Sequence, residues 1–327
     1  MVAKHLGASV LIVSNNRDAH VPLVTRILAE RGVTFFVFNT EEFGEGVLGS
    51  FSLNSRPGLF LDNGSVSVDL NQIRSVWYRR PELPELTHIH EQDARKFAQH
   101  EQKAFLDGIL ASLDCRWLSH PASIREAGHK LKQLGVAREL GFNVPPTLIS
   151  QSPQEIREFY ESLACPLAAK LVAKGPPRTD RPDDQYVIFT QVLNRSDLSD
   201  DTALSACVAM YQPYIEKKYE LRVTVVGKEV YACRIDSQAS EKTRVDWRNY
   251  DLANTPHSTY DLDSTIQKRC IELVQKFGLN YGAIDFIATP EGQLFFLEIN
   301  PNGQWGWIEE LTNMPIAESH ARFLSQH

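Results

Sequence analysis

Two apolar segments near the C-terminus constrain the fold more than any other part of the chain. They read YGAIDFIA and QLFFLEIN, and each carries one acidic residue, Asp285 and Glu298. Their composition predicts two strands, joined by a turn whose tip is Glu291 and Gly292. If the strands pair in antiparallel register about that tip, the two carboxylates face each other, with Cβ atoms about 4.5–5.5 Å apart. The segments therefore predict a hairpin with an acidic pair across it.

Asn300 follows Glu298 by two residues and so projects from the same face of its strand. Two carboxylates and an amide oxygen are hard donors of the kind that Mg²⁺ prefers, with water and substrate phosphates completing its shell. The alternative is a pair of solvated carboxylates at a sheet edge. The apolar neighbours in FFLEIN favour the metal, because an unpaired buried charge is costly. We therefore interpret Asp285, Glu298 and Asn300 as candidate metal ligands.

The first third of the chain has the pattern of an α/β domain. The apolar run SVLIVSNN ends in turn-forming residues, a helix-like stretch follows, and the β-rich TFFVFN comes next. That order is typical of a βαβ unit. Further strand-like segments precede residues 91–113, which place Phe105, Ile109 and Leu113 on one helical face. We expect residues 1–118 to form an N-terminal α/β domain.

A smaller lobe is expected over residues 119–195. Residues 120–140 have a helical pattern that ends before Gly141, a residue type favoured just past a helix C-terminus. Beyond it, LAAKLVA and QYVIFT are strand-like and flank the connector KGPPRTDRPDD. Its prolines and charges predict a long exposed loop.

The remaining residues, 196–327, are expected to form a C-terminal lobe that is rich in strands. Gly227 and Lys228 predict a tight hairpin between two β-like segments. A helix is expected over 264–277, with Asp263 as its N-cap and Gly278 just past its end. The acidic hairpin comes last.

Composition argues against several classes of protein. The chain has 327 residues, a hydrophobic fraction of 43% and a formal net charge of −7, which gives no global attraction to nucleic acid. It lacks an apolar run of about 20 residues, so no membrane partner is expected. The start shows no signal-peptide pattern, and the five cysteines form no C-x-x-C pair. We expect a cytoplasmic protein with reduced thiols.

Two nucleotide motifs and one metal motif can be set aside. The string GEGVLG matches G-x-G-x-x-G, but the strand-like SFSLN follows it where the dinucleotide fingerprint needs a helix. No P-loop sequence is present. His88 and His90 form an H-x-H without an obvious third ligand, so surface histidines are expected.

The order of the remaining motifs resembles that of the ATP-grasp enzymes. Asp285 followed by LEINPN resembles their C-terminal metal motif, and MYQPYIEKKYELRVTVVG resembles their hinge and following strand. The resemblance implies an ATP-grasp fold with an N-terminal Rossmann-like domain, ATP as substrate and Mg²⁺ as cofactor. The nucleotide-contacting residues that it implies are Lys130, Lys170, Gln212, Tyr214, Ile215, Glu220, Arg222 and Asn300, with Glu220 at the ribose and Arg222 at the terminal phosphates.

The need for cations is independent of the family. ATP carries several negative charges, and an enzyme without a P-loop must supply Lys, Arg and Mg²⁺ instead. Most lysines are simply solvated. Lys170 is the exception, because it interrupts an apolar strand where it needs an anionic partner.

Four further segments narrow the resemblance. SVWYRRP, CRIDSQ, DWR and FGLNYGAIDFI resemble, over nearly the whole chain, the ATP-grasp maturases of ribosomal peptides, which are the microviridin and graspetide macrocyclases. This implies that an Asp or Glu side chain of a precursor peptide is phosphorylated. A Thr or Ser hydroxyl, or a Lys amine, then attacks and forms an ω-ester or ω-amide crosslink. The partner is a precursor peptide with leader and core, and a homodimer is expected.

The narrower resemblance also assigns basic residues. Arg248 of DWR would contact the transferring phosphoryl group, which arginine stabilises electrostatically. Arg79 and Arg80 would either contact an acidic core peptide or pin the N-terminal lobe through salt bridges. Lys174 and Arg178 lie in the connector, where leader recognition is expected.

Two other functions remain open at this point. An ATP-grasp ligase that acts on free amino acids or extends a peptide tail would share every nucleotide residue. A non-catalytic, nucleotide-dependent peptide-binding module belongs to a different class, and the retained set of lysines, arginines and carboxylates argues against it.

Overall fold

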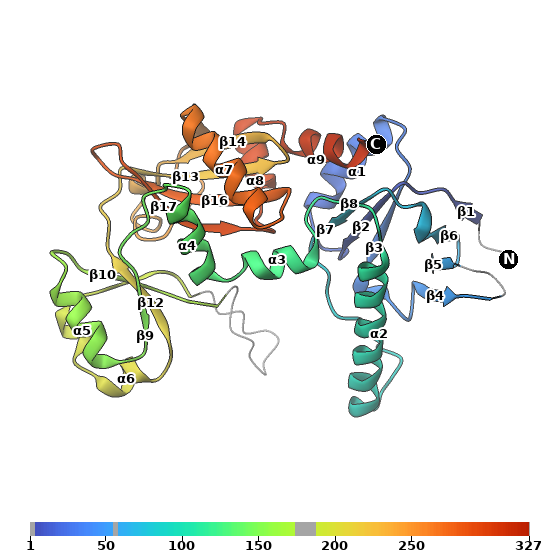
Figure 1. The fold of residues 1–327 in the computed structure, drawn as a ribbon, viewed down its shortest axis with the longest axis horizontal. Helices are drawn as coiled ribbons and strands as arrows, with labels where there is room; N and C mark the ends of the chain where they lie inside the picture. The colour runs from blue at the N-terminus through green and yellow to red at the C-terminus, as the bar shows by residue number, and fades with distance from the viewer. Residues whose placement is uncertain (1–3, 55–57, 174–187, 327) are drawn as a thin grey trace.

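The computed structural model describes residues 4–54, 58–173 and 188–326. Figure 1 shows two sheets at the N-terminal end of the molecule, a small lobe at the opposite end, and a large antiparallel sheet that connects them. None of the helices in the described ranges combines the length and the apolar character that a bilayer crossing needs.

The N-terminal part contains a parallel sheet in the order β3-β2-β7-β8 and a mixed sheet in the order β1-β6-β5-β4. Its elements are β1 (Lys4–Leu6), β2 (Val10–Ser14), α1 (His20–Glu30), β3 (Phe35–Asn39), η1 (Thr40–Glu42), β4 (Leu48–Ser52), β5 (Gly58–Asp62), β6 (Val66–Asp69), η2 (Leu70–Gln72), β7 (Ser75–Tyr78), α2 (Gln92–Ser112) and β8 (Arg116–Trp117). The predicted βαβ opening is confirmed, because β2 and β3 are parallel and α1 joins them. A strand, β4, begins inside GEGVLG, so the dinucleotide fingerprint is absent there.

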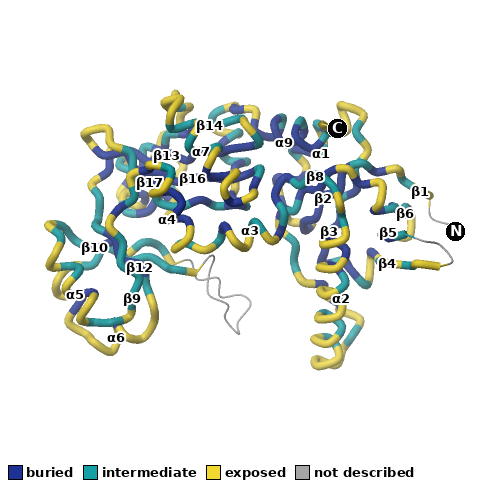
Figure 2. Tube along the Cα trace, viewed as in Figure 1, coloured by how far each residue is buried: buried dark blue, intermediate teal, exposed yellow. Residues whose placement is uncertain are grey.

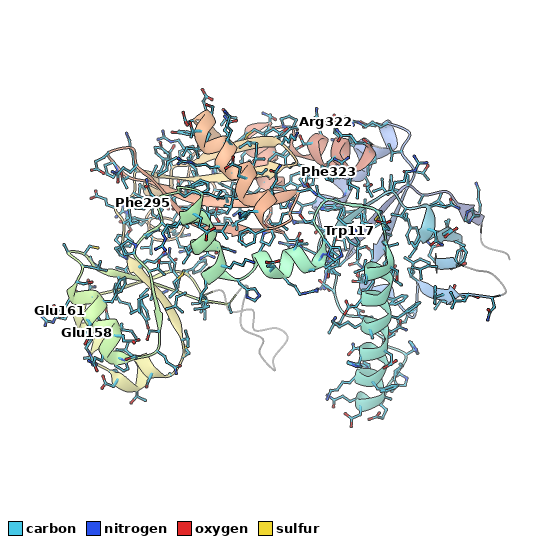
Figure 3. All side chains as sticks on the ribbon, viewed as in Figure 1. Trp117, Glu158, Glu161, Phe295, Arg322 and Phe323 are labelled. Atoms are coloured by element: carbon cyan, nitrogen blue, oxygen red, sulfur yellow. The ribbon has the colours of Figure 1, made fainter. Side chains whose placement is uncertain are left out.

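The central lobe is an antiparallel sheet in the order β11-β10-β12-β9, accompanied by short helices. The elements of this part are α3 (Pro121–Ala127), α4 (Lys130–Glu139), β9 (Leu148–Ser150), α5 (Pro153–Glu161), β10 (Leu167–Lys170), β11 (Gln191–Leu193), η3 (Arg195–Leu198), α6 (Asp201–Ser205) and β12 (Ala209–Pro213). Glu158 and Glu161 mark the exposed face of α5 at the far end of the lobe (Figure 3). The expected boundary at residue 195 falls inside this sheet, because β12 pairs with β10 and β9.

Two expectations for this region are wrong. The single helix expected over 120–140 is divided into α3 and α4, because His129 adopts an extended conformation (φ −82°, ψ 105°) that interrupts it. Lys130 consequently begins a helix. The strand expected at QYVIFT lies partly outside the described residues, and its described end, 188–190, precedes β11 rather than forming a strand.

The C-terminal part is an antiparallel sheet in the order β15-β14-β13-β16-β17. Its elements are β13 (Tyr219–Val226), β14 (Glu229–Ile235), η4 (Ser237–Ala239), β15 (His257–Thr259), α7 (Ser264–Lys276), β16 (Tyr281–Ala288), β17 (Leu294–Asn300), α8 (Gly306–Thr312) and α9 (Ile316–Ser325). The predicted two-residue hairpin is confirmed, since Val226 pairs with Glu229 and Gly227 has φ +62°. The helix predicted over 264–277 is also confirmed, and the Asp263 carboxylate accepts from two N–H groups of its first turn.

The last two helices return the chain to its beginning. No sequence pattern indicated α8 or α9, yet α9 packs against α1, beside which it lies in Figure 1. Trp305 is fully buried in the same core as Val10, Ile12 and Val24. The Ser75 hydroxyl of β7 donates to the Leu324 carbonyl at 2.6 Å. Figure 2 shows this junction as a continuous buried region, whereas much of α2 and β4 is exposed.

Candidate active site

The terminal hairpin places Asp285 opposite Glu298, as predicted. The strand register at its tip, however, differs by one residue from the register expected for a turn centred on Glu291 and Gly292. The tip register pairs Ala288 with Leu294, and Gly292 has φ +85°, a conformation that glycine favours. Continued along the strands, that register would place Asp285 opposite Leu297. A bulge in β17 shifts the register by one residue between Asp285 and Phe286 and restores the acidic pair. The pairing is confirmed, and the centring of the turn is wrong.

Each carboxylate of the pair already binds a cation. Arg222 stands opposite Asp285 on β13, and its Nη1 donates to Oδ1 and Oδ2 at 2.9 and 2.8 Å. Lys130, at the start of α4, donates from Nζ to Oε2 of Glu298 at 2.7 Å. The Asn300 amide donates to Oδ2 of Asp285 and to Oε1 of Glu298, at 3.2 Å in both cases. The amide nitrogen thus occupies a point between two anionic oxygens, where positive charge is favoured.

The two carboxylates differ in their pKa values. Burial acts to raise the pKa of Glu298, but Lys130 outweighs it and brings that pKa down to about 2. Burial raises the pKa of Asp285, and the neighbouring Glu298 adds to this, against the opposing effect of Arg222. Asp285 therefore carries its negative charge at a free-energy cost. An additional cation between the two carboxylates would relieve that cost.

This donor set fits Mg²⁺. Among the described ranges, His, Cys, Asp and Glu side chains nowhere gather in groups of three or more that could hold a metal. Asp285, Glu298 and Asn300, whose amide would turn to present its oxygen in place of its nitrogen, would therefore leave much of the shell to water and substrate phosphates, which is how Mg²⁺ is usually bound. The two histidines set aside above are consistent with a surface role, since His88 pairs with Glu45 at 2.9 Å.

A cavity of about 240 Å³ opens beside the acidic pair, between the central and C-terminal lobes. Asp285, Glu298 and Asn300 form one wall. Most of the predicted nucleotide residues line the cavity as well: Lys130, Lys170, Gln212, Tyr214, Ile215, Glu220 and Arg248. Arg222 lies behind Asp285 and is almost fully buried, so its guanidinium is committed to that carboxylate.

Lys170 and Gln212 form the wall contributed by the central lobe. They stand on the paired strands β10 and β12, and Lys170 Nζ donates to Oε1 of Gln212 at 3.0 Å. The Gln212 amide in turn donates to the Thr147 hydroxyl at 3.0 Å, which fixes the orientation of the buried amide. The Tyr214 N–H donates to the Pro166 carbonyl at 2.8 Å. That N–H is therefore not free to bind a nucleotide base.

Lys170 gives the site a pH dependence. Burial lowers its pKa to about 8, although the Glu298 carboxylate opposes this effect. Above pH 8 the free protein loses the Lys170 charge, so we expect ATP affinity to fall as pH rises, by up to about tenfold per unit. Calorimetric titrations with ATP at pH 7 to 9.5, in two buffers of different ionisation enthalpy, should show proton uptake above pH 8. In Lys170→Arg the cation persists, and that uptake should disappear. Equal proton uptake in both proteins would contradict the assignment to Lys170.

No sequence pattern indicated a role for Lys217, which is buried beside Glu220. Its Nζ donates to Oε1 of Glu220 at 2.6 Å and to the Val245 carbonyl at 2.9 Å. Burial raises the pKa of Glu220 in spite of this partner. Since lysine is usually solvated, nothing in the segment EKKYE distinguishes Lys217 from the exposed lysine beside it.

Asp246 is the first residue of DWR, a segment that predicted a role for Arg248 alone. It forms a two-pronged ion pair with Arg248, whose Nε and Nη2 lie 2.9 and 2.6 Å from its two oxygens. Arg248 keeps 46% of its side chain exposed and faces the cavity, whereas the Asp246 side chain is buried. Burial would raise the pKa of Asp246, but the bonds from Arg248 hold it well below its usual range. Arg248 is thus a fixed and permanent positive charge at the cavity wall.

The two consecutive arginines after β7 differ in environment. Arg79 is 1% exposed, its Nε lies 3.1 Å from Oδ2 of Asp18, and its Nη1 donates to the carbonyls of Asn302 and Gly303 at 2.8 and 3.0 Å. Arg79 therefore links the N-terminal lobe to the loop after β17, as the salt-bridge alternative expected. Such burial is inconsistent with contact to a core peptide. Arg80 is exposed, and the Gln304 amide can orient its oxygen 3.1 Å from Nη1. The other two peptide candidates, Lys174 and Arg178, lie outside the described residues.

Comparison with known proteins agrees with this geometry. The family described as the MvdD pre-ATP grasp domain matches residues 9–125. The macrocyclase MdnC from Microcystis aeruginosa MRC, solved with its precursor peptide MdnA, is 33% identical over 97% of this chain and 99% of its own, with a TM-score of 0.84. A RiPP-associated ATP-grasp ligase from Chryseobacterium gregarium, solved with ADP and a leader and core peptide, is 31% identical over 97% and 96%, with a TM-score of 0.88.

More distant curated relatives are also ligases. The chain is 25% identical over 215 residues to a probable alpha-L-glutamate ligase from Enterobacter sp. (strain 638), which covers 64% of this chain and 67% of the relative. Such identity supports an ATP-grasp ligase without specifying its substrate. The similarity to MdnC and to the Chryseobacterium enzyme extends over nearly all of both chains. The chain therefore belongs to the RiPP-associated family of ATP-grasp ligases, which includes the peptide macrocyclases.

Proposed function

We propose that this ligase activates Asp or Glu side chains of a ribosomally made precursor peptide and closes intramolecular ω-ester or ω-amide crosslinks. The observation that carries the proposal is the cavity, where Lys130, Lys170 and Arg248 line the same space as an acidic pair suited to a divalent metal. The full-length similarity to a macrocyclase solved with its precursor peptide supports a peptide substrate.

The reaction has two balanced steps. A carboxylate oxygen of the peptide attacks the γ-phosphorus of ATP, and the bond from that phosphorus to the β,γ-bridging oxygen breaks. ADP leaves, and the peptide carries an acyl phosphate. A Thr or Ser hydroxyl, or a Lys amine, then attacks the acyl carbon, and phosphate leaves with its electron pair. The proton of the nucleophile passes to phosphate or water. One ATP is hydrolysed and one water is removed from the peptide for each crosslink.

The residues of this chain have distinct roles in the first step. Lys130 and Lys170 bind the phosphates, and the backbone near Ile215 with Glu220 holds the adenosine. Arg248 stabilises the charge that develops on the transferring phosphoryl group. Arg222 keeps Asp285 ionised and in place. Asp285, Glu298 and Asn300 would hold Mg²⁺, which when bound supplies electrostatic stabilisation to phosphate oxygens.

Peptide recognition is proposed for the exposed arginine after β7 and for the connector. Arg80 stands outside the cavity lining, beside the loop that follows β17, where it can bind carboxylates of an acidic core. Lys174 and Arg178 remain candidates for contact with the leader. A homodimer, implied by the family resemblance, and a cytoplasmic location complete the proposal.

The nearest alternative is ligation of free amino acids, as the names of the glutamate-ligase relatives imply for those proteins. The two functions differ in the mass of the product. The candidate precursor to look for is the product of a short neighbouring reading frame with repeated Thr- and Asp/Glu-rich segments. Incubated with enzyme, ATP and Mg²⁺, that peptide should lose one water per crosslink in intact-mass spectrometry. A gain equal to an amino acid residue, when free amino acids are added, would contradict the macrocyclase proposal.

A further inference from the structure

The Asp246 carboxylate joins two parts of the molecule that are separate in sequence. From the C-terminal part, Arg248 binds it through its backbone N–H at 3.1 Å as well as through its guanidinium. From the central lobe, Thr190 donates to Oδ2 through its backbone N–H at 3.1 Å and its hydroxyl at 3.0 Å. Five donor contacts thus converge on one buried carboxylate.

Thr190 is coupled to Lys170 by strand pairing. The ladder between β10 and β11 pairs Ala169 with Gln191. Lys170, at the end of β10, and Thr190, just before β11, stand opposite each other one position further along that ladder. Lys170, which lines the cavity, and Thr190, which binds Asp246, therefore lie at the same end of the β10–β11 strand pair. A displacement of this end of the pair moves both.

We propose that Thr190 and Asp246 are positioning residues, which orient the Arg248 guanidinium when the central lobe is seated on the nucleotide. The inference rests on the proposed function, in which Arg248 stabilises the transferring phosphoryl group. Thr190 moves with the central lobe and, through its two hydrogen bonds, fixes the Asp246 carboxylate. That carboxylate in turn orients the Arg248 guanidinium. ATP held by Lys170 is thereby matched with an arginine whose orientation depends on the position of the central lobe.

The bonding supports a directional role rather than simple packing. A planar guanidinium held by two parallel N–H···O bonds has a fixed orientation, unlike one held by a single contact. Arg248 is anchored through Nε and Nη2, so its other terminal nitrogen is directed away from Asp246. Loss of the Thr190 hydroxyl would remove one of the hydrogen bonds to Oδ2 of Asp246. That oxygen is the one that accepts from Nη2 of Arg248.

The test uses Mg·ADP with aluminium fluoride, a mimic of a phosphoryl group in transfer, and the full-length protein. Calorimetry gives the affinity for Mg·ADP with and without aluminium fluoride. The ratio of these two affinities is the gain in affinity that the mimic provides. In Thr190→Val we expect that gain to fall about tenfold, the scale of one hydrogen bond to a charged group. ADP affinity alone should change less than about twofold. Thr190→Ser retains the hydroxyl and should restore the gain, and Thr202→Val, an exposed threonine of α6, is the matched control.

A double variant distinguishes a role through Arg248 from an independent effect. If Thr190 acts through Arg248, Thr190→Val should add no further loss in an Arg248→Lys background. A full gain in Thr190→Val, or losses that add in the double variant, would overturn the positioning role. A full gain in Arg248→Lys would instead contradict the catalytic role of Arg248 in the proposed function. Melting temperatures of all variants identify any that fail to fold.

Discussion

Replacing Glu298 by Gln is expected to lower kcat for ADP release by about 10³-fold, the scale of removing a preorganised electrostatic contact from a phosphoryl-transfer site. The substitution keeps the shape of the side chain but removes the negative charge that faces Asp285 across the hairpin. We expect the Mg²⁺ concentration for half-maximal activity to rise as well. Both quantities are measured by coupled ADP assay with the candidate precursor peptide, ATP and a Mg²⁺ series.

Stability must be separated from catalysis in this variant. Without Glu298 the Lys130 ammonium loses its carboxylate partner, and breaking such a pair is destabilising. The double variant Glu298→Gln with Lys130→Met removes both charges and should regain melting temperature but no activity. Asp261→Asn, an exposed carboxylate before α7, should change neither quantity. If Glu298→Gln turned over at the normal rate at the usual Mg²⁺ concentration, the metal assignment would be wrong.

Replacing Arg79 by Met is expected to destabilise the protein by about 3–5 kcal/mol, because it leaves the Asp18 carboxylate buried without its main cation. The carbonyls of Asn302 and Gly303 would also lose their donor. At roughly 2–4 °C per kcal/mol, the fall in Tm should be about 10 °C. Thermal unfolding followed by circular dichroism, with limited proteolysis of the loop after β17, measures it.

The neighbouring arginine provides the matched control for this change. Arg80→Met alters an exposed side chain and should change stability by less than about 0.5 kcal/mol. Combining Arg79→Met with Asp18→Leu removes the unpaired charge and should recover part of the lost Tm. If Arg79→Met retained full stability while peptide affinity fell, the peptide-contact alternative would have to be reinstated for Arg79.

The hairpin shows how much of the site the sequence could predict. Strand periodicity and one turn were enough to bring Asp285 opposite Glu298, because residues on paired strands have few alternatives once the turn is located. The prediction succeeded although the turn was misplaced by one residue, since a bulge compensated for the error. A bulge has no clear sequence signal here, so agreement at this pair was partly fortunate.

Other features depend on distant contacts and could not be predicted. Gln133 is buried and holds β17 by bonding both the N–H and the carbonyl of Ile299, yet on α4 it reads as an ordinary polar residue. The burial of Arg79 follows from the loop after β17, more than 200 residues later, as its bond to Asn302 shows. Two of the contacts to Asp246 come from Thr190, which belongs to another lobe. Local patterns carry no information about such partners.

The packing of α9 on α1 has a consequence for synthesis on the ribosome. The strand β2 is made long before Ile316, Ala321 and Leu324, which belong to the core that covers it. Until those residues emerge, the nascent N-terminal sheet exposes an apolar face that is prone to association. The N-terminal domain should therefore need chaperone protection until α9 has been made and can pack against α1.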